Sequence, residues 1–257
     1  MVTMNELLRS RLGIALENNI TFENLPDVLE RMAKHIPFEN MRIMQKNITA
    51  ITQAYLMDKL FAQKEGGLCY ELNTTLQLFL MENGFEAMMV RGVVYNHMNQ
   101  SWNKVGRTHV TLLVPYKGQM YLVDTGFGGN LPLKPVPLNG EVVTSENGEF
   151  RVERQDSEYG DYLFYMKLKH KDEDWKLGYA FHSKDVVTTY EVLNQIQATI
   201  ADHPESSFNK APLLTRLTDQ GNILLSQNSF IEWKDGKMKK TEIAEQQFEE
   251  WKRMYFY

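Results

Sequence analysis

Hydrophobic residues in the first third of the chain follow the spacing of amphipathic helices. One buried helical face requires apolar residues three or four positions apart. The first set with this spacing is Leu25, Val28, Leu29 and Met32. With Asn24 as a cap and Pro26 in the first turn, it predicts a helix from Pro26 through about His35.

A second long helix is predicted to begin close to Cys69. The preceding pair Gly66-Gly67 interrupts a short helix predicted over Met57–Gln63. Beyond Cys69, four apolar residues occupy positions i, i+4, i+7 and i+8 of one helical face. They are Leu72, Leu76, Phe79 and Leu80.

The middle of the chain, from Phe85 to about Ala180, has the pattern of short strands. Five runs are rich in β-branched and aromatic residues and are separated by Gly, Asn and Asp. They are AMMVRGVVY, THVTLLVPY, QMYLVDTGF, EFRVER and YLFYMKLK. Their regular spacing predicts an antiparallel sheet or a small barrel.

From about Asp185 the pattern mixes helix and strand. VVTTYEVLNQIQATI has helical spacing, and AEQQFEEWKRMYF closes the chain as a helix. Between them, LLTRLT, NILLSQ and SFIEWKDGKMKKTEI have the pattern of strands, with Asp235-Gly236 as a hairpin turn. A helical part, a β part and a mixed part in series indicate an α+β fold instead of a doubly wound sheet.

Composition narrows the class of protein. The 257 residues are 43% hydrophobic and 24% charged, which is a globular balance. The formal charge of −5 argues weakly against nucleic acid or an anionic membrane as the main partner. The single cysteine excludes an internal disulfide and a cysteine-based zinc cluster, and it fits a reducing compartment. The N-terminus is amphipathic and charged, so we expect a cytoplasmic protein without a membrane span.

Two other polar segments have simple interpretations. His97 lies in a polar loop, and no second ligand stands at a usual metal-binding spacing, so we expect no metal site. The basic run Lys234–Lys240 is interpreted as a solvated hairpin, with contact to coenzyme phosphates as the alternative.

Cys69 stands where a nucleophile can be built. Two glycines before a helix allow a tight turn and a close approach of backbone or ligand. A thiol in the first helical turn feels the positive end of the helix dipole, which favours thiolate. The alternative is a small buried hydrophobe, the usual fate of a free cysteine.

His109 and Asp124 are predicted to share one face of a hairpin. With Tyr116-Lys117 as the turn, the two residues are directly opposed. With Lys117-Gly118 they are diagonal neighbours on the same face, and only a three- or five-residue loop separates them. The carboxylate can then orient the imidazole, whose other nitrogen takes a proton from a thiol. Taken singly, His109 also fits a core histidine and Asp124 a turn former.

Five segments, in this order, span nearly the whole chain: IPFENM from Ile36, GGLCYELN around Cys69, THVTLL with His109, VDTGFGG from Val123 and HPESSF from His203. They resemble the motifs of the arylamine N-acetyltransferase family, including its Gly-Gly-x-Cys and Asp-x-Gly-Phe-Gly segments. Carried over position by position, the resemblance makes Cys69 the acetylated nucleophile, His109 the base and Asp124 the orienting carboxylate. It further implies four ligand-binding residues: Phe38 and Phe127 for the acceptor, and Gly106 and Gly128 for the coenzyme.

The resemblance also implies a domain organisation and a reaction. A helical domain (1–84) would carry the cysteine, a β-barrel (85–184) the histidine and aspartate, and an α/β lid (185–257) would follow. The three residues would form a Cys-His-Asp core like that of cysteine proteases. The reaction would be ping-pong acetyl transfer from acetyl-CoA to an arylamine or arylhydrazine, in xenobiotic metabolism, by a monomer or weak homo-oligomer without a metal.

One position departs from the family pattern. The family usually has Arg directly before the Gly-Gly pair, and this chain has Glu65. That arginine is expected to support the active-site loop against the carboxylate of Glu39. Two carboxylates are therefore expected to face each other unless Lys64 or Arg91 compensates, at a cost of about 3–5 kcal/mol for a lost buried partner.

Two alternatives to the acetyltransferase remain from the residues. The same triad serves thiol hydrolases and transglutaminases, and Glu65 would also fit a weakly active member that mainly binds small molecules. For the acetyltransferase we predict a thiolate–imidazolium pair of Cys69 and His109 at neutral pH. Iodoacetamide should then alkylate Cys69 rapidly well below about pH 8.5, where a free thiol ionises.

Overall fold

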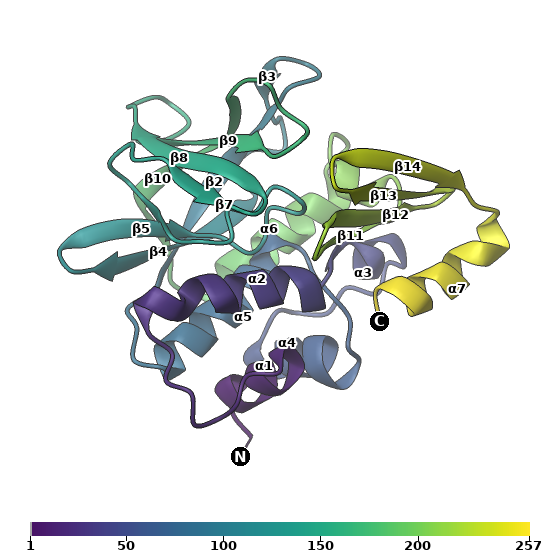
Figure 1. Ribbon diagram of the computed structural model, residues 1–257, viewed down its shortest axis with the longest axis horizontal. Helices are drawn as coiled ribbons and strands as arrows, with labels where there is room; N and C mark the ends of the chain where they lie inside the picture. The colour runs from purple at the N-terminus through teal and green to yellow at the C-terminus, as the bar shows by residue number, and fades with distance from the viewer. Residues whose placement is uncertain (1) are drawn as a thin grey trace.

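The N-terminal part of the chain is helical, as its pattern predicted. The computed structural model describes residues 2–257. Figure 1 shows the first helices gathered beneath the sheets, with α5 directly under strands β2 and β4. The helical elements are α1 (Met4–Leu12), η1 (Phe22–Asn24), α2 (Leu25–His35), α3 (Met41–Met44), α4 (Gln53–Met57), η2 (Asp58–Ala62) and α5 (Cys69–Glu82).

Helix α2 confirms the predicted buried face. It begins at Leu25, one residue earlier than predicted, and has Pro26 in its first turn. The four apolar residues of the predicted face are all buried. Asn24 precedes the helix, but its side chain accepts from the Thr21 N–H at 2.8 Å and does not cap α2.

The two helices on either side of Gly66-Gly67 are also present. The predicted segment Met57–Gln63 is the end of a longer helical stretch, because α4 starts at Gln53 and continues directly into the π-helical turn η2. Helix α5 begins at Cys69 and buries its predicted apolar face. The predicted start of this helix at Cys69 is therefore confirmed.

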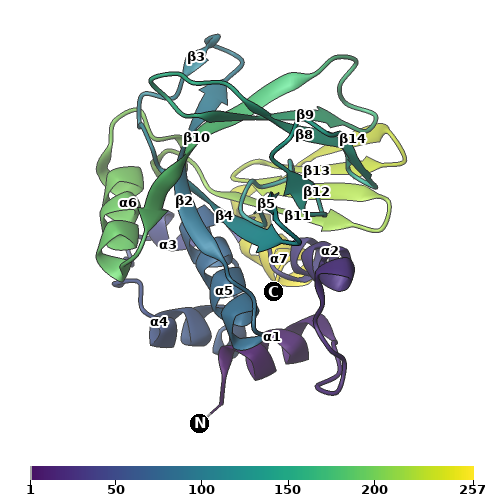
Figure 2. The ribbon, with the colours of Figure 1, turned by 90° about the vertical axis from the view of Figure 1, so that its left-hand side faces the viewer.

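The middle of the chain forms a nine-stranded antiparallel sheet that curls into a nearly closed barrel (Figures 1 and 2). The strand order is β6-β5-β4-β2-β10-β9-β8-β7, with β3 paired to β2. The strands are β2 (Met88–Asn96), β3 (Ser101–Trp102), β4 (His109–Tyr116), β5 (Gln119–Val123), β6 (Val136–Pro137), β7 (Val143–Ser145), β8 (Gly148–Arg154), β9 (Tyr162–Leu168) and β10 (Lys176–Val187). All five predicted runs are strands.

The β4–β5 hairpin has the second of the two predicted same-face registers. Tyr116 pairs with Gln119, which leaves Lys117-Gly118 as the turn. Both turn residues have positive φ, 48° and 78°, as a tight two-residue hairpin turn requires. His109 and Asp124 are consequently diagonal neighbours on one face.

The boundary between the barrel and the next helix differs from the prediction. Strand β10 extends to Val187, whereas the strands were expected to end near Ala180 and helical spacing to start at Val186. The two β-branched residues Val186 and Val187 pair with Val90 and Met89 of β2, because their stiff side chains suit the pleated sheet. Helix α6 (Tyr190–Asp202) therefore starts later than predicted.

The C-terminal part forms a second sheet covered by a helix. Its strand order is β1-β11-β12-β13-β14, and the Asp235-Gly236 turn is confirmed, with φ of 50° and 78°. Strand β1 (Phe38–Glu39) comes from the helical part and pairs with β11. The remaining elements are η3 (Ser207–Asn209), β11 (Leu213–Thr218), β12 (Gly221–Ser226), β13 (Ser229–Lys234), β14 (Lys237–Glu242) and α7 (Glu245–Tyr255).

Helix and antiparallel sheet are thus combined in series, as expected for an α+β fold. Parts distant in sequence nevertheless share a core: Leu193, Ile196 and Ile200 of α6 pack into the cluster formed by α1, α2, α5 and β4. The domain division after residues 84 and 184 stays a prediction. Within residues 2–257, no helix combines the length and hydropathy needed to cross a membrane.

Candidate active site

Three different elements place the predicted chemical residues next to one another. Cys69 is the first residue of α5, His109 is the first of β4, and Asp124 directly follows β5. All three are buried, with 6%, 4% and 1% of their surfaces exposed. His109 Nε2 lies 2.8 Å from Asp124 Oδ2, and Cys69 Sγ donates to the carbonyl of Thr108, the residue before His109, at 3.5 Å. The structure therefore brings the predicted residues together.

His109 is held in its charged form by its neighbours. Burial alone would lower its pKa, but the attraction and hydrogen bond of Asp124 and the contact with Cys69 raise the pKa to about 10. Because Nε2 faces Asp124, Nδ1 is the nitrogen left for the thiol. A protonated imidazole beside Cys69 is the electrostatic arrangement that favours a thiolate.

Asp124 is a fully hydrogen-bonded buried carboxylate. Oδ2 accepts from His109 Nε2 and from the Tyr179 hydroxyl, both at 2.8 Å. Oδ1 accepts from Asn73 Nδ2 at 2.9 Å and from the Gly126 N–H at 2.7 Å. Burial would raise the pKa of Asp124, but the His109 charge and these hydrogen bonds lower it, so the group stays ionised.

Asn73 joins α5, the helix that begins at Cys69, to the β4–β5 hairpin. Its Nδ2 also donates to the Val110 carbonyl at 2.9 Å, and its Oδ1 accepts from the Thr125 N–H at 3.0 Å. The sequence contained a signal for this role, because Asn73 lies four residues after Cys69 and so on the same helical face. In the sequence pattern, Asn73 is noted only as the last residue of the GGLCYELN motif.

Tyr179 is a second contact of Asp124 that sequence reasoning missed. It lies on β10, is fully buried, and its ring centroid is 4.5 Å from that of His109. Burial and the nearby carboxylate raise its pKa well above the usual value, so its hydroxyl keeps the proton that it donates. Tyr179 is 55 positions from Asp124, and no local pattern marks it.

Gly126 lets the hairpin pack directly on the first turn of α5. A Cβ atom at this position would come within 2.6 Å of Cys69 Cα and of Asn73 Nδ2. Gly66 and Gly67 are restricted in the same way, since their Cβ atoms would approach Pro37 O to 2.0 Å and Glu71 Oε2 to 2.8 Å. The glycines of the two motifs thus permit close approach, as predicted for the pair before Cys69.

An aromatic cavity of about 360 Å³ lies on the far side of Phe127, whose ring contacts that of His109. Phe38, Phe127, Gly128 and Trp233 line it, and the Phe127 ring centroid is 5.1 Å from that of His109. Its size and apolar lining suit a small aromatic ligand. Gly106 does not belong to this lining; it adopts a φ of 81° in the loop before His109.

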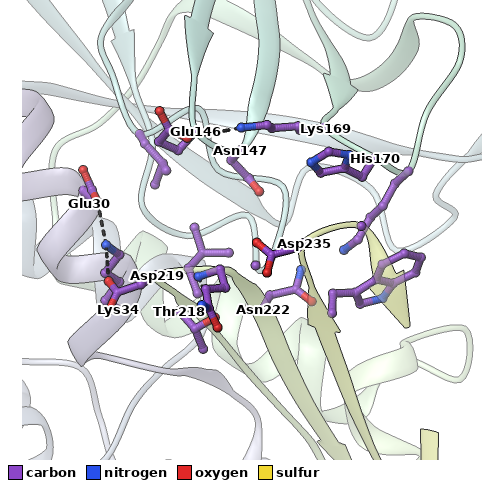
Figure 3. Close-up of a pocket in the computed structure, with 17 residues that line it drawn as sticks. Glu30, Lys34, Glu146, Asn147, Lys169, His170, Thr218, Asp219, Asn222 and Asp235 are labelled. Atoms are coloured by element: carbon purple, nitrogen blue, oxygen red, sulfur yellow. Dashed lines mark hydrogen bonds and ion pairs between the residues drawn. The ribbon is translucent and has the colours of Figure 1, made fainter. Parts of the chain in front are cut away.

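A smaller neighbouring cavity, about 170 Å³, is lined by charged side chains (Figure 3). Its four carboxylates outnumber its three lysines, so it has no surplus positive charge for phosphates. Lys34 contacts Glu30 at 2.6 Å and Asp219 at 2.8 Å, and Lys169 contacts Glu146 at 3.2 Å. The basic run 234–240 is a hairpin whose four lysines are exposed, as predicted.

His97 lies outside the site. Its Nε2 lies 2.7 Å from the Leu177 carbonyl oxygen in the barrel. Within residues 2–257, no group of three or more His, Cys, Asp or Glu side chains has the arrangement of a metal site.

The expectation for Glu65 is wrong. Its carboxylate does not face that of Glu39 but binds Arg42 through two contacts, Nε–Oε2 at 2.7 Å and Nη2–Oε1 at 3.0 Å. Glu39 instead faces Lys59, whose Nζ is 3.2 Å from Oε1. Glu65 and Glu39 therefore face different cations, Arg42 on α3 and Lys59 on η2.

Neither of the expected compensating residues takes part. Lys64 has an exposed side chain, and Arg91 donates to the Arg107 carbonyl at 2.9 Å and 3.1 Å. The Arg11 guanidinium supports the loop by donating to the backbone carbonyls of Lys64 and Glu65. The reason for expecting a weakened site at Glu65 is thereby removed.

Comparison with known proteins agrees with this fold. A sequence model described as N-acetyltransferase matches residues 21–256, which defines a transferase. The uncharacterized acetyltransferase YvcN of Bacillus subtilis is 35% identical over 254 residues, covering 97% of each chain. The chain belongs to the arylamine N-acetyltransferase family.

Solved structures extend the comparison. The arylamine N-acetyltransferase NAT3 of Bacillus cereus has 36% identity and a TM-score of 0.93, over 100% of this chain and 98% of that one. It is described as having a unique Cys-His-Glu catalytic triad, whereas here the carboxylate on His109 is an aspartate. The Mycobacterium marinum enzyme, solved with CoA, has 23% identity and a TM-score of 0.79 over 93% and 87% of the chains, a likeness of fold.

Proposed function

We propose that the protein transfers the acetyl group of acetyl-CoA to arylamines or arylhydrazines by a ping-pong mechanism through acetyl-Cys69. The observation that carries the proposal is the 2.8 Å contact of His109 Nε2 with Asp124, beside a cysteine at the N-terminus of a helix. The CoA complex of the M. marinum relative supports acetyl-CoA as the donor.

In the first half-reaction, the Cys69 thiolate attacks the carbonyl carbon of the acetyl thioester. A bond forms from Sγ to that carbon, and the bond to the CoA sulfur breaks. His109 supplies its proton to the departing sulfur, so free CoA leaves as a thiol. Asp124 keeps the imidazole oriented and stabilises its charged form.

In the second half-reaction, the acceptor nitrogen attacks acetyl-Cys69. The neutral His109 formed in the first step takes a proton from this nitrogen, and the C–S bond breaks to release the N-acetylated product. Cys69 returns as thiolate and His109 as imidazolium. One difficult aminolysis is thereby divided into two easier transfers.

The aromatic cavity is the proposed acceptor site. Phe38 and Phe127 would hold the ring of an arylamine, with Phe127 adjacent to His109. Aromatic rings favour offset or edge contacts with one another. Gly128 in the same lining supports the proposed approach of the coenzyme, while the role of Gly106 rests on the family motif.

The decisive experiment separates the two half-reactions. The protein is mixed with acetyl-CoA alone, and intact mass spectrometry follows the gain of one acetyl group, which can form a thioester only at Cys69, the sole cysteine. An arylhydrazine added afterwards should remove the acetyl group and yield acetylated product. Cys69→Ala and Cys69→Ser variants serve as controls that keep the cavity.

Other results of this experiment would indicate other functions. Peptide or amide cleavage without CoA would indicate a thiol hydrolase or transglutaminase, and ligand binding without either activity would indicate a binding protein. A Cys69→Ala variant that kept the full transfer rate would refute the mechanism.

A further inference from the structure

A second set of buried charges lies behind the first turn of α5. Lys59, on η2, is 1% exposed, and Glu39 and Glu71 are 1% and 2% exposed. Lys59 Nζ donates to Glu71 Oε1 at 2.7 Å and forms an ion pair with Glu39 Oε1 at 3.2 Å that lacks hydrogen-bond geometry. One ammonium therefore lies between two buried carboxylates that come from different elements.

Glu71 connects this ammonium to the start of the nucleophile's helix. Its Oε2 accepts from the N–H of Leu68, the residue that precedes Cys69, at 2.9 Å. Its Oε1 also accepts from the Tyr55 hydroxyl at 3.1 Å. Two helical positions turn the chain by about 200°, so Glu71 supports the first turn from the side opposite Cys69.

Glu39 connects the same ammonium to the glycine loop. Its backbone N–H donates to the Gly67 carbonyl at 3.0 Å, and its Oε2 accepts from the Met41 N–H at 2.5 Å. Gly67 in turn donates to the Pro37 carbonyl at 3.1 Å. The glycine loop before α5 and the residue that precedes Cys69 are thus each joined to a residue whose carboxylate contacts Lys59.

We propose that Lys59 is a positioning residue that fixes the first turn of α5, and with it Cys69, by holding Glu39 and Glu71 together. The inference concerns the geometry of Cys69 and rests on the proposed function only where acetyl transfer is the readout. Lys59 touches neither Cys69 nor the aromatic cavity, so it acts through the helix.

Electrostatics explains why a lysine is needed there. Burial works against its charged form, but the attraction of Glu39 and Glu71 raises the pKa of Lys59, and the ammonium stays charged. Without it, two like charges would remain close together in a buried place. The neighbouring Arg42–Glu65 pair is already balanced and offers no spare cation. Buried ion pairs often contribute little to stability compared with apolar packing, so a positioning role accounts for this one.

The test compares Lys59→Met with Lys64→Met, which removes an exposed lysine five positions away. The rate constant for alkylation of Cys69 by iodoacetamide is measured from about pH 5 to 9. Lys59→Met should move the rate profile upward by about one pH unit, which slows alkylation about tenfold at pH values below the midpoint of the unmodified protein. Lys64→Met should match the unmodified protein.

Rescue distinguishes positioning by charge from loss of packing. In the double variant Lys59→Met with Glu39→Gln, one unpaired carboxylate is gone, and the alkylation rate should recover severalfold. Lys59→Gln, which keeps a hydrogen-bond donor for Glu71, replaces Lys59→Met if the latter does not fold. Hydrogen exchange of the Leu68 amide should accelerate in the Lys59 variants more than exchange in the β4–β5 hairpin.

An alkylation profile that keeps its midpoint in the folded Lys59 variants, with unchanged Leu68 exchange, would overturn the inference. Failure of the proposed function gives a different result, because unmodified protein would then form no acetyl-Cys69. In that case faster Leu68 exchange in the variants would still support the role of Lys59, and unchanged exchange would still refute it.

Discussion

Two buried carboxylates on opposite sides of one helical turn, Asp124 and Glu71, show how similar contacts serve different purposes. Both help to hold the start of α5, and each has a cationic partner within 2.8 Å. Asp124 contacts an imidazole that, in the proposed mechanism, gives a proton to the departing CoA sulfur and takes one from the acceptor. Glu71 contacts an ammonium that keeps its charge, so its side of the turn is a fixed support.

The difference lies in the partner and in access. His109 borders the aromatic cavity through Phe127, whereas Lys59 is 1% exposed and lines neither cavity next to the site. The proposed reaction requires a group such as His109 that exchanges protons near the substrate. A structural support requires a group such as Lys59 that keeps its charge. The four predictions below can break this distinction, beginning with the largest expected effect.

Replacing Asp124 by Asn should lower the rate of acetyl transfer by about 10³–10⁴-fold, because an amide neither fixes the tautomer of His109 nor stabilises its charge. Stopped-flow detection of CoA release measures the rate. Asp124→Glu is the matched control, because it keeps the charge, and a Cys-His-Glu triad is described for the B. cereus relative. Equal losses in both variants would assign Asp124 a role in packing instead.

The two cations should respond differently to pH. The pKa of His109 is raised to about 10, so its contribution to stability is fully present below its unfolded pKa of about 6.5 and lost as pH rises towards 10. The pKa of Lys59 is raised from an already high value, so its contribution should stay constant over that range.

Urea unfolding between pH 6.5 and 10 tests this difference, in a Cys69→Ala background that removes the titration of the thiol and leaves Asp124 as the group that raises the pKa of His109. His109→Gln should flatten the decline of the free energy of unfolding with pH. Lys59→Met should lower that free energy at every pH without changing the slope. A flattened slope in the Lys59 variant would contradict the assignment of a fixed charge.

Gly126→Ala should destabilise the fold by about 1–3 kcal/mol, because its Cβ would overlap atoms of Cys69 and Asn73 at 2.6 Å. Gly129→Ala is the control, since a Cβ there meets only Asn222 Nδ2 at 3.4 Å. Thermal unfolding compares the two. A loss of stability in Gly129→Ala as large as in Gly126→Ala would show that the approach to α5 is not the cause.

Arg42→Met should have the smallest effect, about 0.5–1 kcal/mol of stability, since the side chains of Arg42 and Glu65 are 20% and 21% exposed. The midpoint of urea unfolding measures it, and Glu65→Gln should give a similar loss. A loss as large as that of Lys59→Met would place Glu65 within the buried support instead of at its edge.

Local patterns accounted for the part of the site that is local in sequence. The glycine pair and apolar spacing predicted the start of α5 at Cys69, and turn arithmetic predicted that His109 and Asp124 share a face. The structure adopts the same-face register whose turn is Lys117-Gly118, and both turn residues have positive φ. Glycine adopts positive φ more easily than Tyr116 would in the alternative turn.

The supporting contacts could not be predicted because they join distant positions. Arg42 and Glu65 are 23 positions apart, and Tyr179 and Asp124 are 55 apart. Lys59 lies in a short segment whose pattern gives no sign that a lysine would be buried. Only the packing of η2, β1 and α5 determines that Glu39 and Glu71 meet the same ammonium.

The close approach at Gly126 also bears on how the protein folds. Cys69 becomes enclosed only when the β4–β5 hairpin and the loop that follows it dock on α5, and the approach of Gly126 to Cys69 spans more than fifty positions of the chain. Contacts of such sequence separation form slowly compared with single helices. Trapping of the thiol by a fast reagent during refolding would therefore act as a clock, since the time at which Cys69 acquires its native reactivity dates the docking of the hairpin.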